Sequence, residues 1–316
     1  MANYSWFFLA LVGPVLYGVI NHIDKNLLEK YFKEDGVGTL LIYSVLLSSV
    51  LVPVALFMDP TVLQVSHSNM AVLAGVAALD VVLLWAYLKA MESDEPTVVI
   101  IYYQLIPVLG LVFGYLLLGE VITHTQLVAM VITLVGTGVV AFELNEDKII
   151  FKKKTAGFML IACTCWALEG TIFKKVALEE NLWRSIFWEH LVLGIFGLGL
   201  FCFVPKYRKG FLKQFSTGKQ DGRPAIIVGV NIVSEMLYMT GSVAMASASL
   251  MVPVALLLLV NSYQAVFVMV IGVLLAVFFP KLATEKVSGR HLMQKVIAIA
   301  ITGVGTYLLL QSGVEV

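Results

Sequence analysis

The chain has 316 residues, of which 59% are hydrophobic and only 13% are charged, and its mean hydropathy is +0.92. Soluble domains are about 45–50% apolar with about a quarter of their residues charged, so this composition excludes an ordinary water-soluble protein. Lys and Arg together number 21, as do Asp and Glu, so the charge balance indicates no nucleic-acid partner.

Ten apolar segments follow one another along the chain, each close to the ~20 residues that a helix needs to cross a ~30 Å hydrocarbon core. Their approximate limits are 4–24, 38–58, 70–91, 97–118, 125–143, 156–177, 184–204, 224–245, 250–279 and 291–311. Each must be helical, because lipid offers no partner to a free backbone amide or carbonyl group. The first segment has no basic residues before it and no A-x-A-like site after it, so we expect a retained span.

Prolines interrupt four of these spans, at Pro14, Pro53, Pro107 and Pro253. Each removes a helical hydrogen bond and favours a kink, which neighbouring helices and water can compensate inside a bundle. We interpret Pro14 and Pro53 as simple bends, whereas Pro107, within YYQLIP, is equally consistent with a functional kink. The ninth span is long enough for a strong tilt or a break.

Basic residues collect in every second connection, after spans one, three, five, seven and nine. The other connections carry only Lys174, Lys175 and Arg184, and Lys295 lies inside the tenth span. The positive-inside rule then places the odd-numbered connections in the cytoplasm and both termini outside. The strongest signal is the connection 205–223, with KYRKGFLKQ, which we interpret as a solvated loop.

The chain looks duplicated. IDKNLLEK after the first span resembles FKKVALEE after the sixth, which matches Lys25 with Lys175, and Glu120 and Glu285 precede spans five and ten after similar intervals. Because each repeat holds five spans, an odd number, the second half must be inverted relative to the first, as in many secondary transporters. We place the repeats at 1–143 and 156–311, joined by a linker at 144–155.

Paired glycines recur in both repeats, in LVGTGVV and ITGVGTY, and match Gly136 and Gly138 with Gly303 and Gly305. A nucleotide-binding fingerprint would need a strand, a turn and a following helix, whereas these glycines lie inside apolar helical runs. We therefore expect them to permit close helix packing.

These features resemble the EamA-type members of the drug/metabolite transporter superfamily. LLLGEVITHTQLVAMVITLVGTGVV has that family's apolar helix, Gly-Glu turn and glycine-spaced helix, and INHIDKNLL and WALEGTIFKK fit its first-helix pattern. The resemblance covers nearly the whole chain and implies a small-solute transporter, often an exporter, of the inner or plasma membrane. It also implies cytoplasmic termini, the reverse of the lysine pattern. The arginine that often starts the family's second and seventh helices is missing from LLIYS and IFWEH.

Charged side chains at bilayer depth cost at least ~2.5–3.5 kcal/mol, so those within the spans should face protein or a water-filled cavity. Asp80 lies halfway through the third span and Glu235 midway through the eighth, at nearly matching positions of the two repeats. Glu169 lies in the sixth span, and Glu189 and His190 lie early in the seventh. We expect a central site between the repeats.

Amides and aromatic residues share helix faces with these carboxylates; Asn231, Glu235 and Tyr238, for example, fall at i, i+4 and i+7. The candidate substrate-binding residues are Asn21, Asp80, Trp85, Tyr87, Tyr102, Tyr103, Gln104, Trp166, Glu169, Glu189, Asn231, Glu235, Tyr238, Asn261, Tyr263 and Gln264. The alternatives are hydrogen bonds between helices for the carboxylates, and packing or interfacial anchoring for the aromatic rings.

The stretch VINHIDKNLL, at the end of the first span, carries four polar residues close together. We interpret His22, Asp24 and Lys25 as a helix-end cluster in the membrane interface, and we assign Asn21, which is slightly deeper and shares a face with Tyr17, to the cavity.

The leading hypothesis is a secondary transporter, and an exporter, of a small organic metabolite, working by alternating access in a bacterial inner membrane. Aromatic rings would hold apolar or cationic parts of the solute, with a cation–π attraction of about 0.5–2 kcal/mol. A carboxylate that moves between wet and dry surroundings changes its pKa, so Asp80 and Glu235 are the candidates for proton coupling.

Two other classes stay open: a structural or sensory membrane protein without flux, and an intramembrane enzyme. An enzyme would need a nucleophile–base pair or metal ligands, and the five histidines show no HExxH spacing. The three cysteines form no CxxC pattern, so no disulfide framework or zinc site is indicated. We expect no metal and no cofactor, and a monomer or homodimer whose partners are a small-molecule solute and the lipid bilayer.

Overall fold

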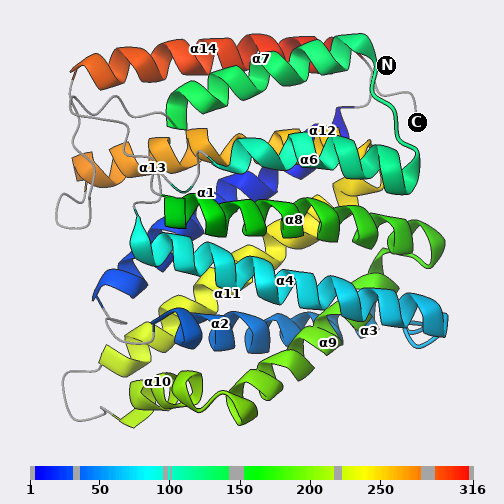
Figure 1. Cartoon of the computed structure of the whole chain (residues 1–316), viewed down its shortest axis with the longest axis vertical. Helices are drawn as coiled ribbons and strands as arrows, with labels where there is room; N and C mark the ends of the chain where they lie inside the picture. Colours follow the sequence, from blue (N-terminus) through cyan, green and yellow to red (C-terminus); the bar gives the residue numbers. More distant parts are fainter. Residues whose placement is uncertain are drawn as a thin grey trace.

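The computed structural model describes residues 4–30, 36–94, 99, 102–141, 153–216, 223–278 and 289–312, and within these ranges it contains helices and no strand (Figure 1). The helices are α1 (Ser5–Lys30), α2 (Gly36–Leu47), η1 (Ser48–Val50), α3 (Leu51–Met58), α4 (His67–Ser93), η2 (Tyr102–Gln104), α6 (Leu105–Phe113), η3 (Gly114–Leu118), α7 (His124–Ala141), α8 (Lys153–Glu179), α9 (Leu182–Phe203), α10 (Pro205–Ser216), α11 (Arg223–Ser249), α12 (Val254–Asn261), α13 (Gln264–Phe278) and α14 (Gly289–Gln311).

Six helical stretches are long and apolar enough to cross a membrane: Ser5–Leu28, Gly36–Met58, His67–Ser93, Lys153–Glu179, Leu182–Phe203 and Val254–Leu275. Three shorter apolar helices accompany them, at Tyr102–Leu118, His124–Val139 and Ile297–Gln311, and α11 occupies the position of the predicted eighth span. The described part of each predicted span is therefore mainly helical, and the ninth span becomes helical only after Pro253. Residues 144–152 of the predicted linker, and Glu285, lie outside the described residues.

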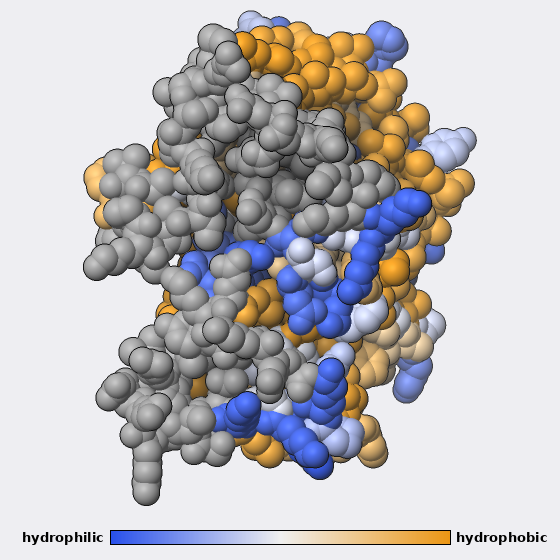
Figure 2. Space-filling view, turned by 60° about the vertical axis from the view of Figure 1, so that its left-hand side comes forward, coloured by the Kyte–Doolittle hydropathy of each residue, from blue (hydrophilic) through white to orange (hydrophobic). Residues whose placement is uncertain are grey.

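The helices run side by side, with α7 and α14 forming one margin of the bundle and α10 lying at the other (Figure 1). Both chain termini lie at one end, and α1, α4, α7 and α13 finish at the opposite end (Figure 1). Hydrophilic residues gather on that opposite end, whereas apolar residues cover the flank beside it (Figure 2). Exposed apolar side chains such as Phe57 and Phe203 are those that a lipid environment would cover.

The second, fourth and ninth predicted spans are interrupted helices. The second turns into a 3-10 segment at η1, and the fourth begins with η2 and ends in the π-helix η3. The ninth breaks between α12 and α13, which is one of the two outcomes, a strong tilt or a break, that its length predicted. Serine hydroxyls explain two of the interruptions, because they bond back to carbonyl groups three residues earlier. Ser48 donates to Val45 O at 2.8 Å, and Ser262 donates to Leu259 O at 2.7 Å.

The proline expectations divide. Pro14 lies inside α1, Pro53 inside α3 and Pro107 inside α6. Pro253 instead lies outside the helix, as the residue that precedes α12, where its fixed φ suits a helix entry and its missing N–H costs nothing.

Close packing of α7 on α14 depends on one glycine from each predicted pair. A Cβ on Gly136 would lie 2.6 Å from Thr302 N, and a Cβ on Gly305 would lie 2.7 Å from Thr133 N. Gly138 and Gly303 have nothing within 4 Å of such a Cβ. The packing expectation is confirmed for Gly136, which packs against Thr302, and for Gly305, which packs against Thr133.

The connection after the seventh span is a helix, α10, so its interpretation as a solvated loop was wrong. Tyr207 lies against Gly38, where an added Cβ would come within 2.4 Å of the ring, and the Phe211 ring lies 4.7 Å from that of Tyr43. The spacing of Tyr207 and Phe211, four residues apart, places both aromatic side chains on the face of α10 that packs against α2.

Candidate functional site

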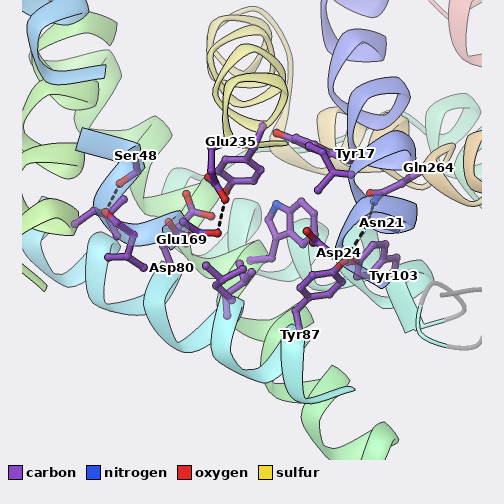
Figure 3. A pocket seen from close by; sticks show the side chains of 18 residues that line it. Tyr17, Asn21, Asp24, Ser48, Asp80, Tyr87, Tyr103, Glu169, Glu235 and Gln264 are labelled. Carbon is purple, nitrogen blue, oxygen red and sulfur yellow. Dashed lines mark hydrogen bonds between the residues drawn. The ribbon is translucent and has the colours of Figure 1, made fainter. Parts of the chain in front are cut away.

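A cavity of about 800 Å³ lies at the centre of the bundle, and residues from both halves of the chain form its wall (Figure 3). This volume counts all the empty space between the lining residues, including space that is open to solvent. Its lining residues are Tyr17, Ile20, Asn21, Asp24, Ser44, Val45, Ser48, Asp80, Leu83, Leu84, Tyr87, Tyr103, Trp166, Glu169, Leu193, Glu235, Tyr238 and Gln264.

Nine of the sequence-predicted residues are among those that line this central cavity: Asn21, Asp80, Tyr87, Tyr103, Trp166, Glu169, Glu235, Tyr238 and Gln264. They come from α1, α4, η2, α8, α11 and α13, so helices far apart in the sequence meet here. Asp80 and Glu235 are both in the wall of this cavity.

A smaller chamber of about 470 Å³ adjoins the central cavity and shares Asp80, Glu169 and Tyr238 with it. Glu189, also predicted, lies in the wall of this chamber beside His190, and their Oε2 and Nδ1 atoms are 3.8 Å apart. His190 Nδ1 donates to Ile186 O at 3.0 Å, an i−4 bond within α9 that fixes the orientation of the ring.

The other predicted residues lie away from the cavity. The Trp85 ring packs edge-on against Phe158 at 5.5 Å, because Trp85 and the cavity-lining Tyr87 are two residues apart and so point to different sides of α4. Gln104 Oε1 accepts a hydrogen bond from Thr137 at 2.5 Å, in the contact of η2 with α7. Tyr102, in the same short helix, is half-buried and packs against the hydrophobic core.

Three further predicted residues are buried elsewhere. Asn231 lies one turn before Glu235 in α11 and is buried without lining the cavity. Asn261 is buried at the break between α12 and α13, and Tyr263, in the same break, bonds through its hydroxyl to Thr306 of α14. Gln264, the first residue of α13 after this break, lines the cavity.

Several cavity residues were absent from the sequence-predicted set, and a helical-face argument could have found them. Tyr17 lies four residues before Asn21, and Asp24 lies three residues after it, so all three share one face of α1. Ser44 and Ser48 are likewise one turn apart. Tyr17, Ser44 and Ser48 were left out of the predicted set because tyrosine and serine are common in apolar spans without lining a cavity.

The interpretation of the polar stretch after Asn21 as an interfacial helix end was wrong for Asp24. Asp24 lines the central cavity and its Oδ2 accepts a hydrogen bond from Tyr87 at 3.4 Å, because α1 continues for six more residues. His22 bonds to Val268 O of α13 at 2.9 Å, and Lys25 donates to the carbonyl oxygen of Asp94 at 2.9 Å.

The central cavity is acidic. Asp24, Asp80, Glu169 and Glu235 contribute carboxyl groups from four different helices, and no Lys, Arg or His is among the described residues of the wall. Glu235 accepts a hydrogen bond from Ser44, which orients the carboxyl group but supplies no charge. Buried carboxylates normally acquire a cation or a proton, so this wall is suited to bind one or the other.

One end of the cavity carries a pair of amides. Asn21 Oδ1 accepts hydrogen bonds from the Tyr87 hydroxyl at 3.0 Å and from Gln264 Nε2 at 3.3 Å (Figure 3). Asn21 Nδ2 and Gln264 Oε1 are buried and have no hydrogen-bond partner among the described residues. One donor and one acceptor are therefore left for a solute.

A polar latch joins three helical elements at the end of the bundle where the termini lie. Lys174 Nζ of α8 lies 2.5 Å from Glu120 Oε1 and donates to Val252 O at 2.6 Å. Glu120 Oε2 accepts from Val254 N, the first residue of α12, at 2.7 Å. Gly119 supplies the left-handed turn, with a φ of 67°, that brings Glu120 back toward the bundle.

At the opposite end, Lys25 of α1 makes a related contact. Its ammonium group donates to the carbonyl oxygens of Met91, at 3.3 Å, and of Asp94, at 2.9 Å, where α4 ends. Each lysine thus bonds to backbone carbonyls in the connection that precedes one of the interrupted spans. The contact of Lys25 therefore resembles that of Lys174, whereas the sequence motifs aligned Lys25 with the neighbouring Lys175.

Comparison with known proteins identifies the kind of protein that builds this site. Residues 4–142 match the EamA-like transporter family. The match bears out the predicted resemblance to this branch of the drug/metabolite transporter superfamily over residues 4–142, and the helices are those of an integral, multi-pass membrane protein. This family comprises transporters, and the described residues contain no group of three or more side chains that could hold a metal ion.

The fold has a counterpart among solved structures. A crystal structure described only as that of a protein is similar over 96% of this EamA-like chain and 96% of its own, with a TM-score of 0.65 and 15% identity. At this identity the likeness concerns the fold alone. No curated protein matches the chain.

Proposed function

We propose that this EamA-like protein is a secondary transporter that binds a small organic metabolite in the central cavity and moves it by alternating access. The observation that carries the proposal is a cavity of about 800 Å³, with four carboxyl groups and two incompletely bonded amides, inside a multi-pass membrane protein. Ionisable groups at such a depth commonly mark a substrate or ion pathway.

The pattern of helix contacts supports two inverted repeats, at 1–143 and 156–311. The most extensive contacts are α7 with α14, α4 with α8, and α1 with α11. In two such repeats α1 corresponds to α8, α4 to α11 and α7 to α14. Exchanging each helix for its counterpart turns the contact of α4 with α8 into that of α11 with α1, and it leaves the contact of α7 with α14 unchanged. The antiparallel contact of α7 and α14 is reciprocal, with Gly136 on Thr302 and Gly305 on Thr133, as a two-fold axis between them requires.

The two lysine contacts supply candidates for the gates. The Lys174–Glu120 latch ties α8 to the start of α12 at one end, and Lys25 ties α1 to the end of α4 at the other. In an alternating-access cycle one latch opens as the repeats rock about the cavity and the other stays closed.

Export, proton coupling and location in a bacterial inner membrane with external termini complete the proposal. Asp80 and Glu235 share the cavity wall, so a proton and the solute would compete for, or act through, neighbouring groups. Basic residues of the odd-numbered connections favour the cytoplasm for the end at which α4 and α13 finish.

The test is solute counterflow into proteoliposomes that contain the purified protein, screened with pools of amino acids, amines, nucleosides and sugars. We expect accumulation of one labelled class above that in protein-free liposomes. Glu235→Gln should abolish the dependence of uptake on an imposed pH gradient, and Trp85→Phe, a change outside the cavity, should preserve it. Absence of counterflow for every class in folded protein would favour a structural or sensory role.

A further inference from the structure

We propose that the solute of the central cavity is an organic cation, an amine or ammonium compound whose charged group is held between the carboxyl groups of Asp80 and Glu169 and whose body lies against aromatic rings. This inference rests on the proposed transport function and specifies its substrate class. It is carried by four independent features of the cavity: its charge, its aromatic wall, its amides and its lack of metal-ion geometry.

The charge of the wall selects the sign of the ligand. Asp80 and Glu169 lie together toward one end of the cavity, with Glu235 close by (Figure 3). The two lysines of the surrounding helices are engaged elsewhere, Lys25 with carbonyl oxygens and Lys174 with Glu120. An anionic solute would meet four carboxyl groups and no described basic side chain, whereas an ammonium group would supply the missing counter-charge.

The aromatic wall suits the body of such a solute. The Tyr17 ring lies 6.2 Å from that of Trp166 and 5.5 Å from that of Tyr238, and Tyr103 lies 5.3 Å from Trp166. All four line the cavity, so their rings form a continuous surface next to the carboxyl groups. Aromatic faces attract ammonium groups and stack on apolar or aromatic carbon frameworks, with indole the strongest of them.

The amide end is a second observation that points to a ligand. Asn21 is 3% exposed and Gln264 is 1% exposed, and both line the cavity. Asn21 Nδ2 and Gln264 Oε1 have no partner in the described part of the chain, although buried polar atoms are nearly always hydrogen-bonded. Figure 3 places these amides away from Asp80 and Glu169, so a solute would bring a neutral hydrogen-bonding group to this end.

An inorganic cation fits less well. A bound metal ion needs several oxygen, nitrogen or sulfur ligands converging on one point. No group of three or more acidic, histidine or cysteine side chains in the described ranges has that arrangement. The fourth carboxyl group of the wall, that of Asp24, instead lies at the amide end of the cavity, away from Asp80 and Glu169 (Figure 3).

The decisive experiment compares isosteric probes on the wild-type protein, so it does not depend on a variant that folds. Binding of 2-phenylethylamine, 2-phenylethanol and phenylacetate to purified protein is measured by quenching of tryptophan fluorescence. We expect the amine to bind at least tenfold more tightly than the alcohol or the acid. Phenyltrimethylammonium and spermidine, as further probes, show whether a quaternary or an aliphatic amine competes with the aromatic one; competition by either supports the cation site.

Variants then locate the site. Glu169→Gln should lower the affinity for 2-phenylethylamine at least tenfold, and Glu92→Gln, which alters an exposed carboxylate paired with Lys89, should leave it unchanged. Melting temperatures of both variants confirm that they are folded. Equal affinity of wild-type protein for the three isosteres, or equal loss in both variants, would overturn the inference.

Failure of this inference can be separated from failure of the proposed transport. Counterflow of a neutral or anionic solute without amine binding overturns the substrate class and leaves transport intact. Tight amine binding without exchange of any amine across proteoliposomes supports the binding site and overturns transport.

Discussion

The latch and the central cavity both contain charged side chains inside the bundle, but in the part of the chain that the structure describes only the charges of the latch have partners of opposite sign. In the latch, the Lys174 ammonium group meets a carboxylate and a carbonyl oxygen, and both oxygens of Glu120 are engaged. In the central cavity, four carboxyl groups face open space with no basic partner among the described residues. Charge that is neutralised inside the protein holds helices together, and charge that is not neutralised leaves binding capacity for something that enters.

The largest effect should come from breaking the latch. Lys174→Met would leave Glu120 buried beside the start of α12 without its cation, and removal of one partner of a buried ion pair costs about 3–5 kcal/mol. Unfolding in mixed micelles measures the loss in free energy. The double variant Lys174→Met with Glu120→Leu should recover part of it, and a single variant as stable as wild type would show that the latch does not hold the helices.

A smaller loss of stability should follow from filling the contact of α7 with α14. Gly136→Leu would drive side-chain atoms into the backbone of Thr302, and overpacking of this kind costs about 1–3 kcal/mol. Gly138→Leu is the matched control, because a Cβ there meets nothing within 4 Å. The same unfolding assay compares the two, and equal effects would contradict the reciprocal glycine contact.

A substitution in the cavity should affect solute exchange rather than stability. Asp80→Asn removes a carboxyl group that has no basic partner among the residues that the structure describes, so we expect the variant to be as stable as wild type or more stable. We also expect the rate of solute exchange to fall at least tenfold, which corresponds to about 1.4 kcal/mol. Melting temperature and proteoliposome exchange are measured on the same preparation. If Asp80→Asn melted as early as Lys174→Met, the carboxyl group would be a structural partner rather than part of a binding site.

The smallest effect concerns a surface carboxylate outside the spans. Hydrogen bonds from the Thr61 side chain, from Asn181 and from the Thr61 backbone lower the pKa of Asp59 from 3.8 to about 2. Because the folded pKa lies below the unfolded value, this carboxylate stabilises the fold above about pH 4, and the contribution is lost as the pH falls toward 2. The melting temperature of wild type should exceed that of Asp59→Asn at pH 4.5, and the difference should shrink at pH 2.5.

The sequence was informative about the positions of the helices and about isolated polar residues. It was less informative about how each helix is turned about its own axis. Long apolar runs identified the positions of the spans, and Asp80 and Glu235 stood out because charge is rare at that depth. Which face of a helix meets the cavity depends on packing against neighbours, so Trp85 was included in error and Tyr17 was overlooked. Asp24 was assigned to the membrane interface because it lies near the end of an apolar run, and the run does not show which face of α1 meets the cavity.

The sequence also did not show which residue of one proposed repeat corresponds to which residue of the other. Matching short motifs aligned Gly136 with Gly303 and Lys25 with Lys175. The contacts of these residues, interpreted with the proposed two-fold relation, align Gly136 with Gly305 and Lys25 with Lys174 instead. Short apolar motifs can be aligned almost equally well after a shift of one or two residues, so the choice between alignments needs the contacts in the structure.

The central claim, that the cavity is open to water on alternate sides of the membrane, is tested most directly by labelling a cysteine placed in its wall. Leu84→Cys, in a background where Cys163, Cys165 and Cys202 are replaced, is exposed to a membrane-impermeant maleimide from either side of oriented vesicles. Leu309→Cys, at a side chain that is 1% exposed and outside the cavity, is the control. We predict labelling of Leu84→Cys from both sides and none of Leu309→Cys. Labelling of Leu84→Cys from neither side, or from one side only under every condition, would contradict the account.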